Sequence, residues 1–356
     1  MTDLESTLNC IEPTDDAFEE QARSRINTLT MPPRALGRIL DLAERLAAIT
    51  RSLDPPTARK KIVTMAADHG VVAEGVSAFP QEVTGQMVHN FVAGGAAINV
   101  LSRLVGADVV VVDMGVAPDL SALADAGKIV SKRIRGGTDN MAKGPAMIRE
   151  EAVRAVEAGI DVVEALCDDG LDLLGTGDMG IGNTTPSAAI AAVVTGKSVG
   201  EVTGRGTGIN DEGLARKVAV IQQAIDTNKP DPSDPLDVLS KVGGLEIGGL
   251  AGCVLGAAAR RKPVLIDGLI STAGALIAVK LCPAARGYIV SSHQSVEIGH
   301  QAMLAEIGHE PLLDLDMRLG EGTGAALAMN LVEAAKRILT EMATFDDAQV
   351  SSGLSD

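Results

Sequence analysis

A glutamate among glycines is the strongest chemical signal near the C-terminal end of the chain. Glu321 lies within Arg318-Leu-Gly-Glu-Gly-Thr-Gly324, and an apolar run with helical spacing follows from Ala325 to Ile338. Glycines permit unusual backbone angles and a close approach to a ligand. A glutamate kept from water has a raised pKa and can accept a proton. Taken alone, the segment favours a solvated loop glutamate beside a helix start.

A second glycine-rich segment, Gly175 to Ser187, follows an apolar run and leads into a helix-like run that begins at Ala188. Backbone N–H groups at such a junction bind anions, and the helix dipole favours a phosphate. The segment has neither the Walker lysine nor the usual GxGxxG spacing. It indicates phosphate or ribose binding, with a capped tight turn as the alternative.

Further glycine-containing segments also favour binding of a ligand that carries a phosphate. Gly204 to Gly208 precedes a helix that carries Lys217, whose ammonium could meet a phosphate or simply lie on a solvated helix face. Asp267-Gly268, Ser291 to Ser295 and Gly243 to Gly249 are expected to be turns or strand ends. Several such segments at one edge of a sheet favour an extended, nucleotide-like ligand.

The connection from Asp68 to Met87 mixes apolar and uncharged polar side chains, which suits a flat organic base. The alternative for its first residues is a structural turn capped by Asp68.

Other catalytic classes lack their motifs. The five histidines form no HExxH pattern and have no CxxC partner, so a zinc site is not expected. There is no GxSxG elbow for an acyl nucleophile. No acidic pair adjoins a threonine-rich phosphate loop, as magnesium-dependent use of a diphosphate donor would favour. We therefore expect no metal and no cofactor.

The amino-acid composition limits which ligands and partners the chain could bind. The chain has 356 residues, a formal net charge of −16 and no basic cluster, which argues against nucleic acid. It has no Trp, one Tyr and four Phe, so a bound heterocycle would not be held in an aromatic cage. Four scattered cysteines and an acidic N-terminus without signal character indicate a cytoplasmic protein, and the apolar runs are too short for membrane insertion.

The elements that must position these groups alternate between strand and helix. Helices are expected over 16–29 and 35–49, and strands over 61–67, 109–113, 171–175, 263–267 and 287–292. Continuous apolar strands separated by helices predict an α/β fold with a Rossmann-like parallel sheet covered on both faces. Ligands of such sheets bind beyond the carboxyl ends of the strands. The polar residues that end or follow strands are Asp68, Asp113, Asp178, Asp267 and Ser292.

From about Pro32 to Ala335 the chain resembles the nicotinate-nucleotide:dimethylbenzimidazole phosphoribosyltransferases. The motifs that carry the resemblance are Asp68-His-Gly-Val-Val, Gly177-Asp-Met-Gly-Ile-Gly-Asn-Thr-Thr-Pro186, Lys241-Val-Gly-Gly, Asp267-Gly, Ser292-His and Arg318 to Met329. The resemblance implies transfer of phosphoribosyl from nicotinate mononucleotide to dimethylbenzimidazole, with inversion, giving α-ribazole phosphate and nicotinate for the cobalamin nucleotide loop.

It also implies roles for individual residues. Glu321 would be the general base, with Asp178 a possible second carboxylate. The donor and its phosphate would be held by Gly177, Gly180, Asn183, Thr184, Thr185, Gly206, Lys217, Gly268 and Ser292. The base pocket would be formed by Ser77, Phe79, Gln86, Met87 and Leu319.

The resemblance further implies a homodimer and a small helical domain built from both chain ends. We expect residues 1–55 to form that domain together with the C-terminal helices. Residues 56–310 would be the α/β domain that binds nucleotide and base, 311–345 the catalytic loop and C-terminal helix, and 346–356 a flexible tail.

The chain departs from the family pattern at two places. Asp178 stands where some members carry a second glutamate, and its shorter side chain weakens a role in proton transfer. Phe79 and Met87 stand where some members have a serine and a glutamine, so the pocket is more apolar and Ser77 or Gln86 would take the polar role. The alternatives are therefore the same transfer to adenine or a phenol, or a non-catalytic nucleotide-binding protein.

Overall fold

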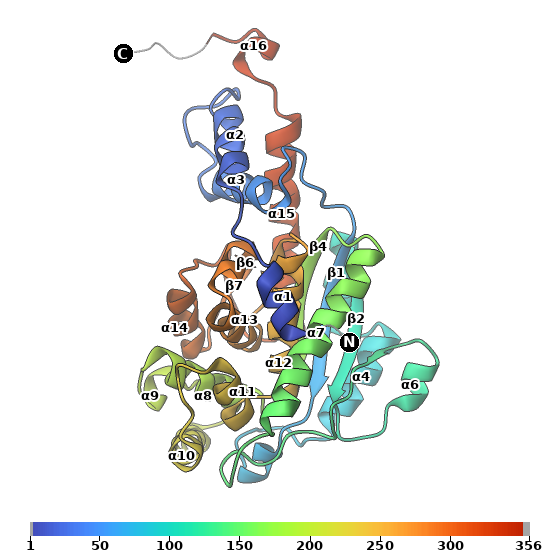
Figure 1. Ribbon diagram of the computed structural model, residues 1–356, viewed down its shortest axis with the longest axis vertical. Coiled ribbons are helices and arrows are strands. Elements are labelled where there is room, and N and C mark those ends of the chain that lie inside the picture. Colours follow the sequence, from blue (N-terminus) through green and yellow to red (C-terminus); the bar gives the residue numbers. More distant parts are fainter. Residues whose placement is uncertain (1–2, 352–356) are drawn as a thin grey trace.

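The computed structural model describes residues 3–351 and consists of a parallel sheet, the helices around it and a helical bundle at one end (Figure 1). The main strands are β1 (Lys60–Ala67), β2 (Ala107–Gly115), β3 (Val130–Ser131), β4 (Leu173–Met179), β5 (Val264–Ile266) and β6 (Ile289–Ser291). They are parallel throughout, in the spatial order β3-β2-β1-β4-β5-β6. This is the order of a doubly wound nucleotide-binding sheet, and it reverses between β1 and β4.

Alternation along the strands explains why both faces are covered. In β1 the side chains of Val63 and Met65 enter one core cluster, and those of Ile62 and Ala66 enter the other. The first face is covered by α7 (Arg149–Asp168), α12 (Leu245–Ala259) and α13 (Leu269–Leu281). The second is covered by α4 (Val83–Ala93), α5 (Ala97–Val105) and α15 (Thr323–Glu341). The predicted fold class is confirmed.

The remaining elements lie around this framework. The helices are α1 (Leu4–Cys10), α2 (Asp16–Ile26), α3 (Arg38–Thr50), α6 (Ser121–Asp125), α8 (Thr184–Thr195), α9 (Val199–Val202), α10 (Asp211–Asn228), α11 (Pro235–Val242), α14 (Ile298–Ile307) and α16 (Phe345–Ala348), with 3-10 turns at Gly70–Glu74 and Pro283–Tyr288. A separate two-stranded parallel sheet joins β7 (His293–Ser295) to β8 (Leu313–Met317). In the described part of the chain no helix is long and apolar enough to cross a membrane.

The bundle at one end is made from both ends of the chain. Helices α2 and α3 pack together, and α15 runs from the sheet into contact with them (Figure 1). Leu29 pairs with Thr344, and Arg25 donates hydrogen bonds to the carbonyl groups of Leu339 and Met342. Helix α1 packs instead against α7 and α12 of the main core. Beyond Thr344 the short helix α16 continues the chain, and residues 352–356 of the expected tail lie outside the described residues.

Two glycine segments differ from their sequence-based interpretation. Gly175 to Asp178, expected to be a loop, is the second half of β4, because its backbone continues the ladder with β1. Gly243 to Gly249, expected to be a turn, is mostly the start of α12. There a Cβ atom at Gly252 would lie 2.0 Å from the carbonyl oxygen of Val156, so the glycines let α12 pack directly on the backbone of α7.

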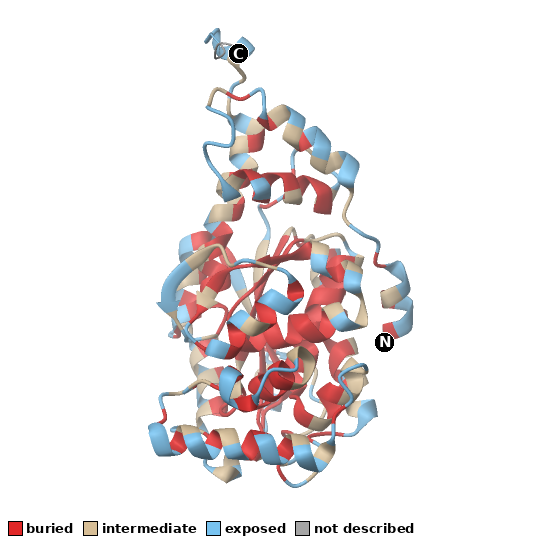
Figure 2. Ribbon diagram, turned by 90° about the vertical axis from the view of Figure 1, so that its left-hand side faces the viewer, coloured by how far each residue is buried: buried red, intermediate tan, exposed pale blue. Residues whose placement is uncertain are grey.

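The buried residues are concentrated in the sheet and its covering helices, and the bundle has its own buried seam (Figure 2).

Candidate active site

A cavity of about 620 Å³ opens at the carboxyl edge of the sheet, beside the point where the strand order reverses. Its walls come from the segments after β4, β5 and β8, from α4 and its preceding loop, and from β7. The lining residues are Phe79, Val83, Met87, Asp178, Met179, Gly180, Ile181, Asn183, Thr184, Gly206, Thr207, Gly268, Leu269, Ile270, His293, Ser295, Glu297, Arg318, Leu319, Gly320 and Glu321.

Glu321 is a buried carboxylate in this wall. Its residue is 6% exposed, and Oε2 accepts a hydrogen bond of 3.1 Å from the backbone N–H of Ile98 at the start of α5. Burial raises the pKa of Glu321, the Ile98 N–H opposes this, and the charge of Asp267 adds to it. Because the Ile98 N–H bonds only to Oε2, Oε1 can accept a hydrogen bond from a ligand.

The backbone of Glu321 is held in a left-handed conformation. Its φ is +64°, which costs a residue with a side chain roughly 1–2 kcal/mol. Two contacts hold it there: its N–H donates to the carbonyl oxygen of Asp178 at 3.3 Å, and its own carbonyl oxygen accepts from Thr64 Oγ1 at 3.1 Å. The glutamate is therefore fixed by both β1 and β4.

Asp267, which directly follows β5, caps the helix that begins after Glu321. Oδ1 accepts from the N–H groups of Gly324 and Ala325 at 2.7 and 3.2 Å, and Oδ2 accepts from Gly322 at 3.1 Å. Burial raises the pKa of Asp267, whereas the nearby His293 and these N–H groups oppose the shift. A carboxylate at a helix N-terminus also complements the helix dipole. Asp267 thus positions the Glu321 loop and does not line the cavity.

Asp178 is the second carboxylate in the wall. Oδ2 accepts from Asn183 Nδ2 at 2.9 Å, while Oδ1 is buried without a hydrogen bond from the described residues. Burial raises the pKa of Asp178 well above its ordinary value, with Asp267 as the next largest cause.

Thr184 opens α8 beside Lys217 of α10. Lys217 is 1% exposed, and its ammonium donates to Thr184 Oγ1 at 2.7 Å. Burial lowers the pKa of Lys217 to about 8, and the Glu297 carboxylate opposes the shift. Gly206 packs against both groups, since an added Cβ would be 2.7 Å from Thr184 Oγ1 and 3.0 Å from Lys217 Nζ.

The sequence-predicted donor residues separate into two groups. Gly180, Asn183, Thr184, Gly206 and Gly268 line the cavity. The other four lie behind its wall. Gly177 is inside β4 and Thr185 is fully buried in α8. The Ser292 hydroxyl donates to the carbonyl oxygen of Ile266 at 2.6 Å. Lys217 is buried beneath Gly206.

The predicted base-pocket residues also separate. Phe79, Met87 and Leu319 line the cavity, and Phe79 and Leu319 are more than half exposed at its mouth. Ser77 lies beside it, within 3.3 Å of Thr207 Oγ1. Gln86 is on the exposed side of α4 and is not one of the lining residues.

Sequence reasoning did not single out His293, Ser295, Glu297 and Arg318 as individual site residues. The short sheet of β7 and β8 brings them together, since β7 carries His293 and Ser295 and β8 leads into Arg318. His293 lies against the start of α15, and its Nδ1 is 3.5 Å from Asp267 Oδ1. The only available signal was the run of polar residues from Ser291 to Ser295, because strands of three residues show no periodicity.

A buried pair supports the floor of the cavity. His69 Nε2 is 2.7 Å from Glu246 Oε1, and both residues are buried. Burial alone would lower the pKa of His69, but the Glu246 carboxylate outweighs it and the pKa is raised. A Cβ at Gly180 would lie 3.2 Å from His69 Nε2, so the glycine loop rests on this pair. His69 therefore has a structural place beneath the loop.

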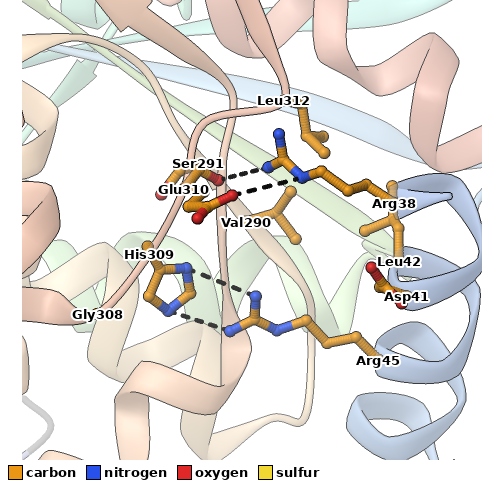
Figure 3. Close-up of a pocket in the computed structure, with 10 residues that line it drawn as sticks. All are labelled: Arg38, Asp41, Leu42, Arg45, Val290, Ser291, Gly308, His309, Glu310 and Leu312. Atoms are coloured by element: carbon orange, nitrogen blue, oxygen red, sulfur yellow. Dashed lines mark hydrogen bonds and ion pairs between the residues drawn. The ribbon is translucent and has the colours of Figure 1, made fainter.

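A smaller cavity of about 190 Å³ lies where α3 meets the segment after α14 (Figure 3). Arg45 reaches across it to His309, with Nη2 3.1 Å from His309 Nε2. Burial and the charge of Arg286 lower the pKa of Arg45 to about 10, and burial lowers that of His309 to about 3. Two guanidinium groups and the carboxylates of Asp41 and Glu310 line it, so it has no net charge and serves to attach the bundle to the sheet domain.

Comparison with known proteins places the chain among enzymes. A model of the family described as "Phosphoribosyltransferase" matches residues 11–350. A nicotinate-nucleotide–dimethylbenzimidazole phosphoribosyltransferase of Syntrophotalea carbinolica is 61% identical over 98% of this chain and 99% of its own length. One of Geobacter metallireducens is 59% identical over 99% of both chains. A crystal structure of the Thermus thermophilus enzyme of that name matches 95% of this chain and 100% of its own, with 46% identity and a TM-score of 0.90.

Proposed function

The chain belongs to the nicotinate-nucleotide–dimethylbenzimidazole phosphoribosyltransferases, and from the geometry of its cavity we propose how it performs their reaction. It transfers the phosphoribosyl group of nicotinate mononucleotide to dimethylbenzimidazole, in cobalamin biosynthesis. The observation that supports a catalytic role for Glu321 is a buried carboxylate in the wall of the cavity, with Oε2 bound to the Ile98 N–H.

The chemistry requires one base and no covalent intermediate. The bond between the anomeric carbon and the pyridinium nitrogen breaks, and its electron pair stays with nitrogen, so nicotinate leaves with a neutral ring. One benzimidazole nitrogen supplies its lone pair to the anomeric carbon from the opposite face. The other nitrogen loses its proton to Glu321, whose pKa is raised by burial. The product has the inverted, α configuration.

Buried carboxylates can stabilise this donor electrostatically. The pyridinium ring of nicotinate mononucleotide is cationic before the transfer, and positive charge develops on the ribose during the transfer. Asp178 lines the cavity and Asp267 lies directly behind it. Preorganised groups of opposite charge stabilise a transition state more effectively than water does. We assign Asp178 an electrostatic and positioning role, with Asn183 holding its carboxyl group.

Two sets of lining residues, one polar and one apolar, favour one orientation of the substrates. Thr184 and Gly206, with Lys217 behind them, would hold the donor phosphate, and Gly268 would border it. Phe79, Met87 and Leu319 provide an apolar wall for dimethylbenzimidazole. Glu321 lies on the same wall as Leu319, two residues along the chain, where it can reach the azole N–H.

We further propose that the enzyme is a cytoplasmic homodimer. Membership of the family supports the dimer. The four cysteines, none of which forms a disulfide, support a reducing compartment.

The direct test is Glu321→Gln, which keeps the size of the side chain and removes the base. Purified protein with nicotinate mononucleotide and dimethylbenzimidazole should release nicotinate, and the variant should lose about 10²–10⁴-fold in kcat while binding the donor normally by calorimetry. Unchanged turnover would exclude Glu321 as the base. Donor binding without nicotinate release, for any of several bases, would instead indicate a non-catalytic binding protein.

A further inference from the structure

The loop from Gly204 to Gly208 covers the buried Lys217 ammonium. Gly206 and Thr184 line the cavity, whereas Lys217 does not. Gly206 has a positive φ of +52°. A Cβ atom at this residue would lie 2.7 Å from Thr184 Oγ1 and 3.0 Å from Lys217 Nζ, so the backbone of Gly206 packs closely against both groups. An anion that enters the cavity must therefore displace this backbone before it touches the ammonium.

Glu297, the residue before α14, holds this loop in place. Its Oε1 accepts a hydrogen bond of 2.8 Å from the N–H of Gly206. Its Oε2 is buried, has no hydrogen bond from the described residues, and lies 2.0 Å from where a Cβ of Gly204 would be. Both oxygens thus face the backbone of the loop, and the residue is only 6% exposed.

Glu297 Oε1 occupies a backbone N–H group that a bound anion could use. The Gly206 N–H and the nearby Lys217 are the groups that a phosphate would use, and the Glu297 charge already favours the charged form of Lys217. Backbone N–H groups of a glycine loop beside a lysine are a general phosphate-binding arrangement. A carboxylate that occupies them would oppose a phosphate dianion by repulsion and by competition for the same donor.

A second contact links the loop to the catalytic segment. Arg318 Nη1 donates to the carbonyl oxygen of Gly206 at 3.1 Å, and Arg318 lies three residues before Glu321. Thr207 Oγ1 in the same loop accepts from the N–H of Ala78, at the edge of the base pocket. Displacement of Gly206 would therefore be transmitted to both the Glu321 segment and the acceptor end of the cavity.

We propose that the Glu297 carboxylate competes with the donor phosphate for the Gly206 N–H and is displaced from it when a phosphate binds. Glu297 is thus a residue that sets donor affinity and makes donor binding move the loop. The identification of the anion as the donor phosphate rests on the proposed function; the competition itself applies to any tetrahedral dianion.

The test is Glu297→Gln, which keeps the shape and a possible acceptor for Gly206 but removes the charge. Sulfate is the probe, because it is a dianion at every working pH, and pH 6.5 keeps Lys217 protonated. Isothermal titration should give about tenfold tighter sulfate binding in the variant, the effect expected when a charged competitor is removed. Glu306→Gln, which removes the same charge from α14 outside the cavity, should leave the affinity unchanged.

A purely structural role for Glu297 predicts the opposite sign. If the carboxylate only orders the loop, the variant will bind sulfate equally or more weakly, and the proposal is wrong. A crystal structure of the unmodified protein with sulfate at Lys217 tests the same point without a variant. Glu297 Oε1 should then lie beyond hydrogen-bonding distance of Gly206 N, and a retained bond would overturn the proposal.

Turnover measurements separate this inference from the proposed function. With nicotinate mononucleotide, Glu297→Gln should lower KM severalfold with little change in kcat. Failure of the unmodified protein to release nicotinate would refute the proposed function but leave the sulfate result standing. Normal turnover with unchanged or weaker sulfate binding in the variant would refute only the role of Glu297.

Discussion

Gly177 lies directly against the carbonyl group of Glu321. A Cβ atom at Gly177 would be 2.2 Å from that oxygen and 2.4 Å from its carbon, distances that only displacement of the loop could relieve. Because Gly177 is inside β4, the strand and the catalytic segment form one rigid contact. Gly177, which the sequence predicted to contact the donor, therefore packs against the backbone of Glu321 behind the cavity wall.

Gly177→Ala should consequently impair catalysis while leaving the fold intact. The methyl group pushes the Glu321 backbone away from β4, and a displacement of about 1 Å can reduce a rate by roughly 10²-fold. Steady-state kinetics and circular dichroism together measure this. Gly175→Ala is the matched control in the same strand, because its methyl group meets only side-chain atoms at 3.1–3.3 Å, and it should keep most of the activity.

The pH dependence of kcat/KM should be bell-shaped. The proposed base Glu321 would act only when ionised, and its pKa is raised by burial, so activity should fall as pH drops through a value above the 4.5 of an ordinary glutamate. Lys217, proposed to support the donor phosphate, would do so only when protonated, so activity should also fall as pH rises through about 8. Rates from pH 5 to 10 at saturating acceptor would show both limbs. Lys217→Arg should move the alkaline limb upward, and an unmoved limb would exclude Lys217 as its origin.

Asp267→Asn should weaken both stability and catalysis. The amide oxygen can still accept from Gly324, but the amide NH₂ would face the Gly322 N–H, donor against donor. Loss of one buried, charge-assisted bond costs about 1–3 kcal/mol of unfolding free energy. Urea denaturation would measure it, with the exposed Asp108→Asn as a control expected to stay within about 0.5 kcal/mol. A variant as stable as the parent would show that the cap is dispensable.

The acceptor preference should follow the polarity of the apolar wall. Phe79→Ser combined with Met87→Gln supplies hydrogen-bonding groups, and should raise the rate with adenine relative to dimethylbenzimidazole by about tenfold. Competition between the two bases, followed by product chromatography, measures the ratio. Val130→Ser, an exposed substitution outside the cavity, should leave it unchanged. An unchanged ratio in the double variant would place the acceptor elsewhere in the cavity.

The bundle should influence catalysis although it lies outside the cavity. Leu46 is fully buried between α3 and its neighbours, and α15 connects that bundle to Glu321. Leu46→Ala should lower stability by about 2–5 kcal/mol and also reduce kcat. Leu255→Ala, equally buried on the other face of the sheet, should cost similar stability with less effect on kcat. Equal effects on kcat would indicate general loosening only.

The sheet was predictable because its strands are continuous apolar runs. The sequence from Lys61 to Ala67 lies within β1, and that from Val109 to Asp113 lies within β2. The edge strand β3 was not foreseen, since its two residues are exposed and give no apolar signal. The end of β4 was mistaken for a loop because glycine is rare in strands. Its reason, the contact of Gly177 with Glu321, is a tertiary one.

The site was predictable where polar residues and glycines are neighbours in the sequence, as around Glu321, Asn183 and Thr184. Residues that act through distant contacts were harder to assign. Asp267 was recognised as a strand-end carboxylate, but its role as the cap of α15 depends on Gly324, 57 positions away. Glu297 gave no signal, because its partner Gly206 is 91 positions away and the loop between β7 and α14 shows no motif.

Helix α15 starts at the catalytic loop and ends in the bundle formed by the two chain ends (Figure 1). The bundle therefore exposes, outside the cavity, one end of a helix whose other end directly follows Glu321, the proposed base. A small molecule or antibody fragment bound to α2, α3 and the end of α15 would contact this helix without occupying the cavity, so neither substrate would compete with it directly. Inhibitor design for this fold need not imitate a nucleotide.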